Sequence, residues 1–222
     1  MRDERTIKLL AASRKINTMR KLIMIFALIG ALVASWNYLT LQKKLSGVLA
    51  SDPRNEGISV FVHFEWFVNP SIIVFDIRDV QSDKSPLDVS RVLLQLSESL
   101  KDNEYHRVVL SFKGRQKFML EGSYFKETGM EYGIQNPVYT LRSLSQNVYK
   151  LDGSQAFSTW TGGFIGVLGK QMEDLTEFHK QWYVAAAIHR DARQAGNEPA
   201  GAPALQGRVR LHDVAGGSRS VR

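Results

Sequence analysis

The sequence predicts an α+β fold: a single N-terminal transmembrane helix, a small extracytoplasmic domain, and a disordered C-terminal tail. In the domain we expect a mixed sheet of about four or five strands, packed by two or three helices. Three observations predict this: an uncharged apolar run, strand and helix patterns that alternate after it, and a final stretch rich in Gly, Pro and Ala. The chain divides accordingly into a basic cytoplasmic leader, a signal-anchor helix, a juxtamembrane linker, the domain and the tail: 1–21, 22–41, 42–57, 58–194 and 195–222.

The apolar run extends from Leu22 to Leu41 and contains no charged residue. At 1.5 Å per residue, a helix of this length just crosses a hydrocarbon core of ~30 Å. Trp36 and Tyr38 lie where an aromatic belt is expected. A cleaved signal peptide is the alternative, because small residues around 33–35 and 48–50 loosely fit a cleavage site, but the run exceeds the usual core of ~7–15 residues. We therefore expect an uncleaved anchor, whether translation begins at Met1 or at Met19.

Charged residues on either side of the run predict its orientation. Residues 1–21 hold 7 basic and 2 acidic residues, whereas the far flank offers Lys43, Lys44 and Arg54, diluted by acidic neighbours. Lys and Arg are enriched on the cytoplasmic side of membrane helices. The N-terminus is therefore predicted to stay in the cytoplasm, with the domain outside, in a bacterial inner membrane facing the periplasm.

The overall basic charge belongs to the two ends of the chain. Residues 185–222 hold 6 basic and 3 acidic residues, so of 29 and 22 in the whole chain the middle keeps 16 and 17. A nearly neutral domain has no excess positive field for nucleic-acid phosphates, and we expect no nucleic-acid partner. The chain has no cysteine, which excludes disulfides, thiolate nucleophiles and Cys-ligated metals.

A βαβ unit is predicted near the start of the domain. Residues 58–67 alternate between apolar and polar side chains, and Asn69-Pro70 marks a turn into a second strand at 71–80. Ser85-Pro86 begins a helix, since Ser is a favoured N-cap and Pro a favoured first residue. A third strand follows at 107–112, which predicts a parallel pairing with the second.

The rest of the domain is predicted as one hairpin, two helices and a short strand. Gly114 favours a turn between strands at 107–112 and 117–121 over a single long strand. A short helix is expected at 122–132 and a strand at 138–141. The longest helix, from Phe164 to about His189, carries an apolar stripe at helical spacing: Ile165, Leu168, Met172, Leu175, Phe178 and Trp182.

Two pairs of polar residues are the strongest candidates for chemistry. His63 and Glu65 lie two apart on one strand face, as a metal or acid–base pair does. Asp76 and Asp79 lie at a strand end before a βα turn, where α/β sheets place ligand groups. The competing interpretation is solvation and ion pairing, and no recognised catalytic motif accompanies either pair. We therefore predict no catalytic residue, no cofactor and no metal.

A glycine-rich segment, residues 160–170, begins the long helix. It lacks the glycine and Ser/Thr positions of a Walker loop, since Phe164 and Gln171 stand there. One hypothesis is a tightly packed helix start. The other is an interaction lip that touches lipid or a partner helix, formed by Trp160, Phe164, Ile165 and Val167.

These observations predict a membrane-anchored envelope protein whose domain serves partner interaction or membrane-complex assembly without catalysis. The expected partners are the lipid bilayer and one or more membrane or envelope proteins. The alternative is a membrane-tethered extracytoplasmic hydrolase or ligand-binding domain that uses Asp76/Asp79 or His63/Glu65.

Overall fold

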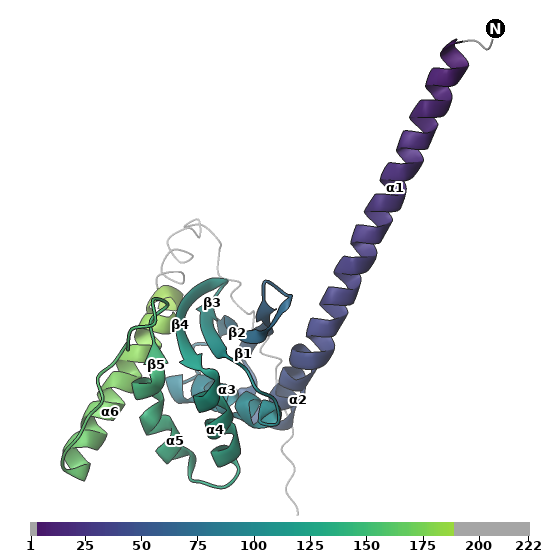
Figure 1. The fold of residues 1–222 in the computed structure, drawn as a ribbon. Helices are drawn as coiled ribbons and strands as arrows, with labels where there is room; N and C mark the ends of the chain where they lie inside the picture. The colour runs from purple at the N-terminus through teal and green to yellow at the C-terminus, as the bar shows by residue number, and fades with distance from the viewer. Residues whose placement is uncertain (1–3, 189–222) are drawn as a thin grey trace, which may run out of the picture. The chain divides into compact units, whose positions relative to one another are not determined.

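The computed structural model describes residues 4–188, except for the side chains of 4–16, 18, 137–139 and 164–165 (Figure 1). Its five strands form one mixed sheet in the order β1-β2-β3-β4-β5, accompanied by helices. The predicted α+β class and mixed sheet are therefore confirmed. The predicted tail, 195–222, lies outside the described residues.

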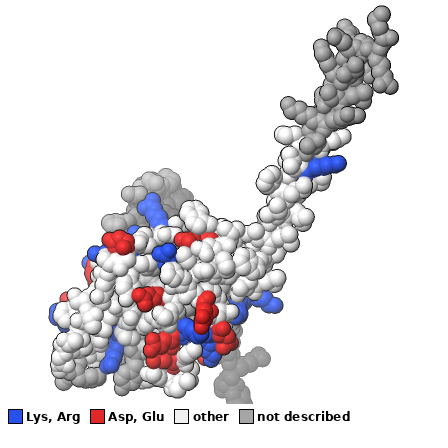
Figure 2. Space-filling model, viewed as in Figure 1, with Lys and Arg blue, Asp and Glu red and all other residues white. Residues whose placement is uncertain are grey.

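One run of helix leads into the domain. It consists of α1 (Glu4–Asn37), the π-helical turn η1 (Tyr38–Gln42) and α2 (Lys43–Ser51). Among the described residues, Met19–Ser51 is the one helical stretch long and apolar enough to cross a membrane. Figure 2 shows its apolar part as a continuous run of uncharged residues.

The predicted linker, residues 42–57, is not an irregular connection. It forms α2 and the short 3₁₀ helix η2 (Pro53–Asn55), because Leu45 and Asn55 are buried against the domain. Composition alone suggested a loop, but this tertiary burial stabilises helix in a segment of weak propensity.

The π-helical turn keeps one face of the helix directed at the domain. Asn37, Leu41 and Leu45 lie four residues apart and are all almost fully buried. At 3.6 residues per turn, each step of four rotates the face by about 40°. A wider π turn counters that rotation, and the three side chains therefore remain in register with the sheet.

Side chains of this helix also accept hydrogen bonds from the backbone of the outermost strand. β1 (Ile58–Glu65) is an edge strand. The backbone N–H of Val62 donates to Gln42 Oε1 at 3.0 Å, and that of Phe64 donates to Asn37 Oδ1 at 2.9 Å. Unpaired edge groups invite pairing with another chain, and here the incoming helix covers two of them.

The predicted βαβ unit is confirmed. β2 (Asn69–Val80) runs antiparallel to β1, and α3 (Pro86–Leu100) connects it to β3 (Arg107–Phe112), which is parallel to β2. The turn between β1 and β2 lies at residues 66–68 instead of at Asn69-Pro70. Proline cannot donate a hydrogen bond to a neighbouring strand, but it is tolerated at the start of a strand, where Pro70 stands.

The predicted hairpin is also confirmed, since β4 (Arg115–Glu121) returns antiparallel to β3. The short strand β5 (Val148–Tyr149) pairs antiparallel with β4. The remaining helices are α4 (Gly122–Tyr132), α5 (Pro137–Leu144), the 3₁₀ turn η3 (Ser145–Asn147), α6 (Phe164–His179) and the π-helical turn η4 (Lys180–Val184).

One predicted strand is wrong. Residues 138–141 belong to α5, and Pro137 begins that helix instead of ending the preceding one. A short run such as Val-Tyr-Thr-Leu does not distinguish a strand from a helix turn, whereas Pro is favoured at the first helical position.

The stripe of the long helix is confirmed in its second half, whereas Leu168 is half-buried and the side chain of Ile165 lies outside the described residues. Leu175, Phe178 and Trp182 are almost fully buried, but Met172 is 37% exposed. Gln171, four residues before Leu175, takes the buried position instead. The buried positions 171, 175, 178 and 182 are therefore spaced by four, three and four residues.

The two faces of the sheet differ in what covers them. The inner face carries the aromatic core, in which Phe75 and Phe118 contact Trp182 and Phe178 of the α6–η4 helix. The outer face carries a small apolar cluster of Ile72, Val74 and Val109. Polar and aromatic side chains of neighbouring strands surround that cluster.

Candidate functional site

A pocket of about 360 Å³ opens on the outer face of the sheet. The strands β1 to β4 and two turns contribute the residues that line it: His63, Glu65, Trp66, Phe67, Val74, Asp76, Arg78, Ser111, Gly114 and Gln116. The tertiary structure thus brings three of the four predicted polar residues to one place. The fourth, Asp79, is absent from this lining, and its carboxylate lies 3.8 Å from Lys113 Nζ.

Asp76 is the most enclosed of these groups, with 1% of its surface exposed. Its two carboxylate oxygens accept from the backbone N–H of Gly114 at 3.0 Å, and Oδ2 lies 2.8 Å from an Arg78 guanidinium nitrogen. A buried charge requires such partners. Asp76 therefore fixes the β3–β4 turn, where Lys113 and Gly114 both have positive φ.

His63 and Glu65 are also occupied by local contacts. The His63 ring stacks on Phe67 with centroids 4.5 Å apart, and its Nδ1 lies 2.7 Å from the Phe64 carbonyl oxygen. Glu65 accepts a hydrogen bond from Asn69 at 3.1 Å. Among the described residues, no group of three His, Cys, Asp or Glu side chains is arranged to hold a metal ion.

Ser111 is a pocket residue that the sequence did not single out. It is 1% exposed, and its hydroxyl has no hydrogen-bond partner among the described residues. Buried hydroxyls are usually satisfied by protein or water. The register places Ser111 directly beside Asp76 on the parallel neighbouring strand.

A second polar pair is buried between two helices. Ser90 of α3 lies 2.8 Å from His179 Nε2, while His179 Nδ1 lies 2.7 Å from the Leu175 carbonyl oxygen. Burial lowers the pKa of His179 to about 4, so the ring is neutral and donates from Nδ1 while accepting from Ser90. The contacts resemble a hydrolase Ser–His pair, but neither residue is exposed, and the pair therefore stabilises the core.

The predicted interaction lip has two described members. The Trp160 indole donates to Asp174 at 2.6 Å, and Lys170 Nζ lies 5.7 Å from the ring centroid. Val167 is half-buried. The side chains of Phe164 and Ile165 lie outside the described residues.

The alternative of a tightly packed helix start finds no support at its glycines. A Cβ added at Gly163, Gly166 or Gly169 meets no described atom within 4 Å. Within the described part of the chain, no other element therefore lies close to α6 at these glycines.

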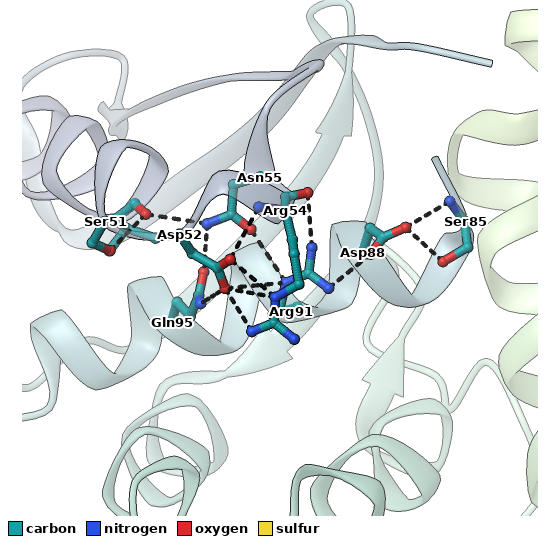
Figure 3. Close-up of polar contacts among 9 residues, drawn as sticks. Ser51, Asp52, Arg54, Asn55, Ser85, Asp88, Arg91 and Gln95 are labelled. Atoms are coloured by element: carbon teal, nitrogen blue, oxygen red, sulfur yellow. Dashed lines mark hydrogen bonds and ion pairs between the residues drawn. The ribbon is translucent and has the colours of Figure 1, made fainter. Parts of the chain in front are cut away.

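A polar network joins the incoming helix to α3 (Figure 3). Asp52, just after α2, accepts hydrogen bonds from Arg54 at 2.7 Å and from Gln95 at 3.0 Å, and Arg91 lies 3.7 Å away. The hydrogen bond from the Arg54 side chain lowers the pKa of Asp52 well below its usual value. Arg91 is further held by Asp88 at 2.7 Å.

Asn55 completes this junction. Its amide donates to Gln95 at 2.7 Å and to the Val48 carbonyl at 3.1 Å, and only 1% of its surface is exposed. The contacts of Asn55 and Asp52 with Gln95 link positions about 40 residues apart, so only folding brings them together.

We found no match to this chain among protein-family models, curated proteins or solved structures. Its function is therefore inferred from its own residues.

Proposed function

We propose that this protein is a single-pass envelope protein, with its N-terminus in the cytoplasm and its α+β domain on the periplasmic side of a bacterial inner membrane. The domain serves partner interaction or membrane-complex assembly and is not an enzyme. The uncharged stretch of α1 and the basic residues before it support the anchor and its orientation.

The observation that carries this proposal is the fixed junction between the anchor helix and the domain. Asn37 and Gln42 bind the edge strand, and Asp52 is held by Arg54, Arg91 and Gln95. A domain attached in this way is held close to the bilayer, as suits a protein that works within a membrane assembly. His63, Glu65 and Asp76, which belong to the alternative hydrolase hypothesis, make structural contacts.

The lip on α6 is the proposed protein-binding surface. Trp160 and Val167 are partly exposed beside open glycine positions, and Met172, five residues after Val167, adds another exposed apolar side chain. Glycines have no side chain and therefore allow another helix to approach closely, while the large side chains beside them can contact it. A membrane or envelope protein with an apolar helix is the partner that fits.

Reporter fusions test the orientation. A phosphatase fused after residue 60 should be active in a bacterial host, and a cytoplasmic reporter at the same position should be silent. The reverse pattern would overturn the topology. A shortened, soluble product would show instead that the apolar segment is cleaved.

Photo-crosslinking tests the lip. A photoreactive amino acid in place of Val167 should give discrete adducts with envelope proteins, and Ile134, which is 87% exposed, provides a matched control position. Trp160→Ala should remove the adducts at residue 167. Adducts that are the same at both positions, or that persist in this variant, would contradict the proposed surface.

Ligand binding in the outer-face pocket is the second candidate function. The unpartnered hydroxyl of Ser111 in the 360 Å³ pocket favours it, because a bound polar molecule would supply the missing hydrogen bond. A small-molecule screen by thermal shift tests it: hits that raise the melting temperature of the natural chain should lose their effect in Ser111→Ala.

A further inference from the structure

The turn between β1 and β2 presents three consecutive large apolar side chains. Trp66 is 80% exposed, Phe67 is 42% exposed and Val68 is 60% exposed. We refer to these three residues as the hairpin tip. The tip is ordered, since the N–H groups of Phe67 and Val68 donate to the carbonyls of Phe64 and Glu65 at 2.8 and 3.2 Å.

The backbone of the tip does not favour these residues. Trp66 and Phe67 have φ values of 52° and 64°, a left-handed conformation at both central positions of the β-turn that the hydrogen bond from Val68 to Glu65 closes. Such turns strongly prefer Asn-Gly or Asp-Gly, and bulky residues with positive φ are outliers. Trp66 and Phe67 are therefore unfavourable residues for this backbone conformation. The exposed Trp66 ring also contributes little to the core.

The tip is fastened to the end of the apolar stretch of α1. The Asn37 side-chain amide donates to the Phe67 carbonyl at 2.7 Å and also to Val33 of its own helix at 3.0 Å. The adjacent residue Trp36 also contacts β1, since its ring centroid lies 4.8 Å from that of Phe64. The hairpin tip thus lies level with Trp36, at the residues expected in the bilayer interface.

We propose that Trp66, Phe67 and Val68 insert into the interfacial layer of the bilayer that α1 crosses, giving the domain a second contact with lipid. This inference rests on the proposed anchor. The occupant is lipid instead of protein because the tip continues the exposed apolar surface of α1, where Leu32 is 62% exposed and Trp36 is 40% exposed. Aromatic side chains favour this layer.

Charged groups mark the depth of insertion. The three tip residues carry no charge, and the nearest carboxylate, Glu65, precedes them and is held by Asn69. Lys43 and Lys44 follow in the helix beyond Asn37, where headgroups are expected. Trp66 and Phe67 also line the outer-face pocket, and that pocket therefore opens beside the membrane surface.

Depth-dependent quenching tests the inference with the full chain in nanodiscs of phosphatidylcholine and phosphatidylglycerol. The chain has no cysteine, so a single Val68→Cys carries one polarity-sensitive fluorophore and leaves Trp66 and Phe67 in place. Its emission should be blue-shifted. Lipids with a shallow spin label should quench it several-fold more strongly than a label at Ile134→Cys.

A double substitution separates lipid contact from folding. Trp66→Asn with Phe67→Gly installs the favoured turn and removes both rings, so the hairpin should persist while the quenching at residue 68 is lost. Unchanged quenching in this variant would overturn the role of the two rings. Circular dichroism should give the same spectrum for both proteins.

A label at Leu32→Cys distinguishes failure of this inference from failure of the anchor. Deep quenchers should reach residue 32 if α1 crosses the bilayer. Quenching at residue 32 without quenching at residue 68 would overturn the hairpin insertion and leave the anchor intact. Absence of quenching at residue 32 would overturn the anchor and the insertion together.

Discussion

The two faces of the sheet are built from the same strands but stabilised by different means. On the inner face, Phe75, Phe178 and Trp182 form a core of touching aromatic rings. On the outer face, Asp76 and Arg78 form an ion pair beside a small apolar cluster and a pocket. Apolar burial is proportional to area and tolerates approximate placement, whereas the polar contacts of the outer face need specific partners. The inner face therefore supplies most of the apolar core, whereas the outer face carries the pocket.

Truncation of Trp182 should cause the largest loss. Its side chain is fully buried, and its indole donates to the Ser111 carbonyl at 3.1 Å. Trp182→Ala should lower the free energy of unfolding by about 3–5 kcal/mol. Phe61→Ala on the outer face removes a half-buried ring and should cost only about 1 kcal/mol. Denaturant unfolding of the full chain in detergent measures both, and equal losses would contradict the division between the faces.

The buried His179 should make the inner face sensitive to acid. Its pKa is about 4 in the folded protein and 6.5 ordinarily, so below pH 6.5 the unfolded chain binds a proton that the folded chain does not. Stability should be constant above pH 6.5 and fall between pH 6.5 and 4, by about 3 kcal/mol in total. His179→Gln should flatten this part of the pH profile, and an unchanged profile would show that other groups cause it.

Loss of the Asp76 charge should have an intermediate effect on the outer face. Asp76→Asn weakens the contacts to Arg78 and to the Gly114 N–H, and should cost about 1–3 kcal/mol because these groups are left partly unsatisfied. Asp79→Asn is the matched control, since Asp79 is 54% exposed at its side chain, and surface changes usually stay within about 0.5 kcal/mol. A reversed order in the melting temperatures would refute the structural role of Asp76.

Ser111 should give the smallest effect. Its buried hydroxyl has no described partner, so Ser111→Ala removes an unsatisfied group and should be neutral or stabilise by less than about 1 kcal/mol. Thermal unfolding in the absence of added ligand measures this. A clear loss of stability would mean that the hydroxyl already has a bound partner.

The sequence by itself determined the apolar helix, the βαβ unit, the β3–β4 hairpin and the buried half of the α6 stripe. Each depends on neighbours one to four residues apart, through helical or strand periodicity and through Pro and Ser at a helix start. Only the tertiary structure decided that residues 43–51 and 53–55 are helical and that 138–141 belong to a helix. Their local signals were short or weak, and burial against the domain outweighed them.

The long-range polar contacts likewise could not be predicted from the sequence. Ser90 meets His179 across 89 positions, and Asn37 meets Phe67 across 30. Nothing in the spacing of such residues identifies their partners, because a hydrogen bond depends on geometry that only the folded chain supplies. For the same reason, three of the four predicted polar residues met in one pocket but were already engaged in contacts there, while Ser111 was left without a partner among the described residues.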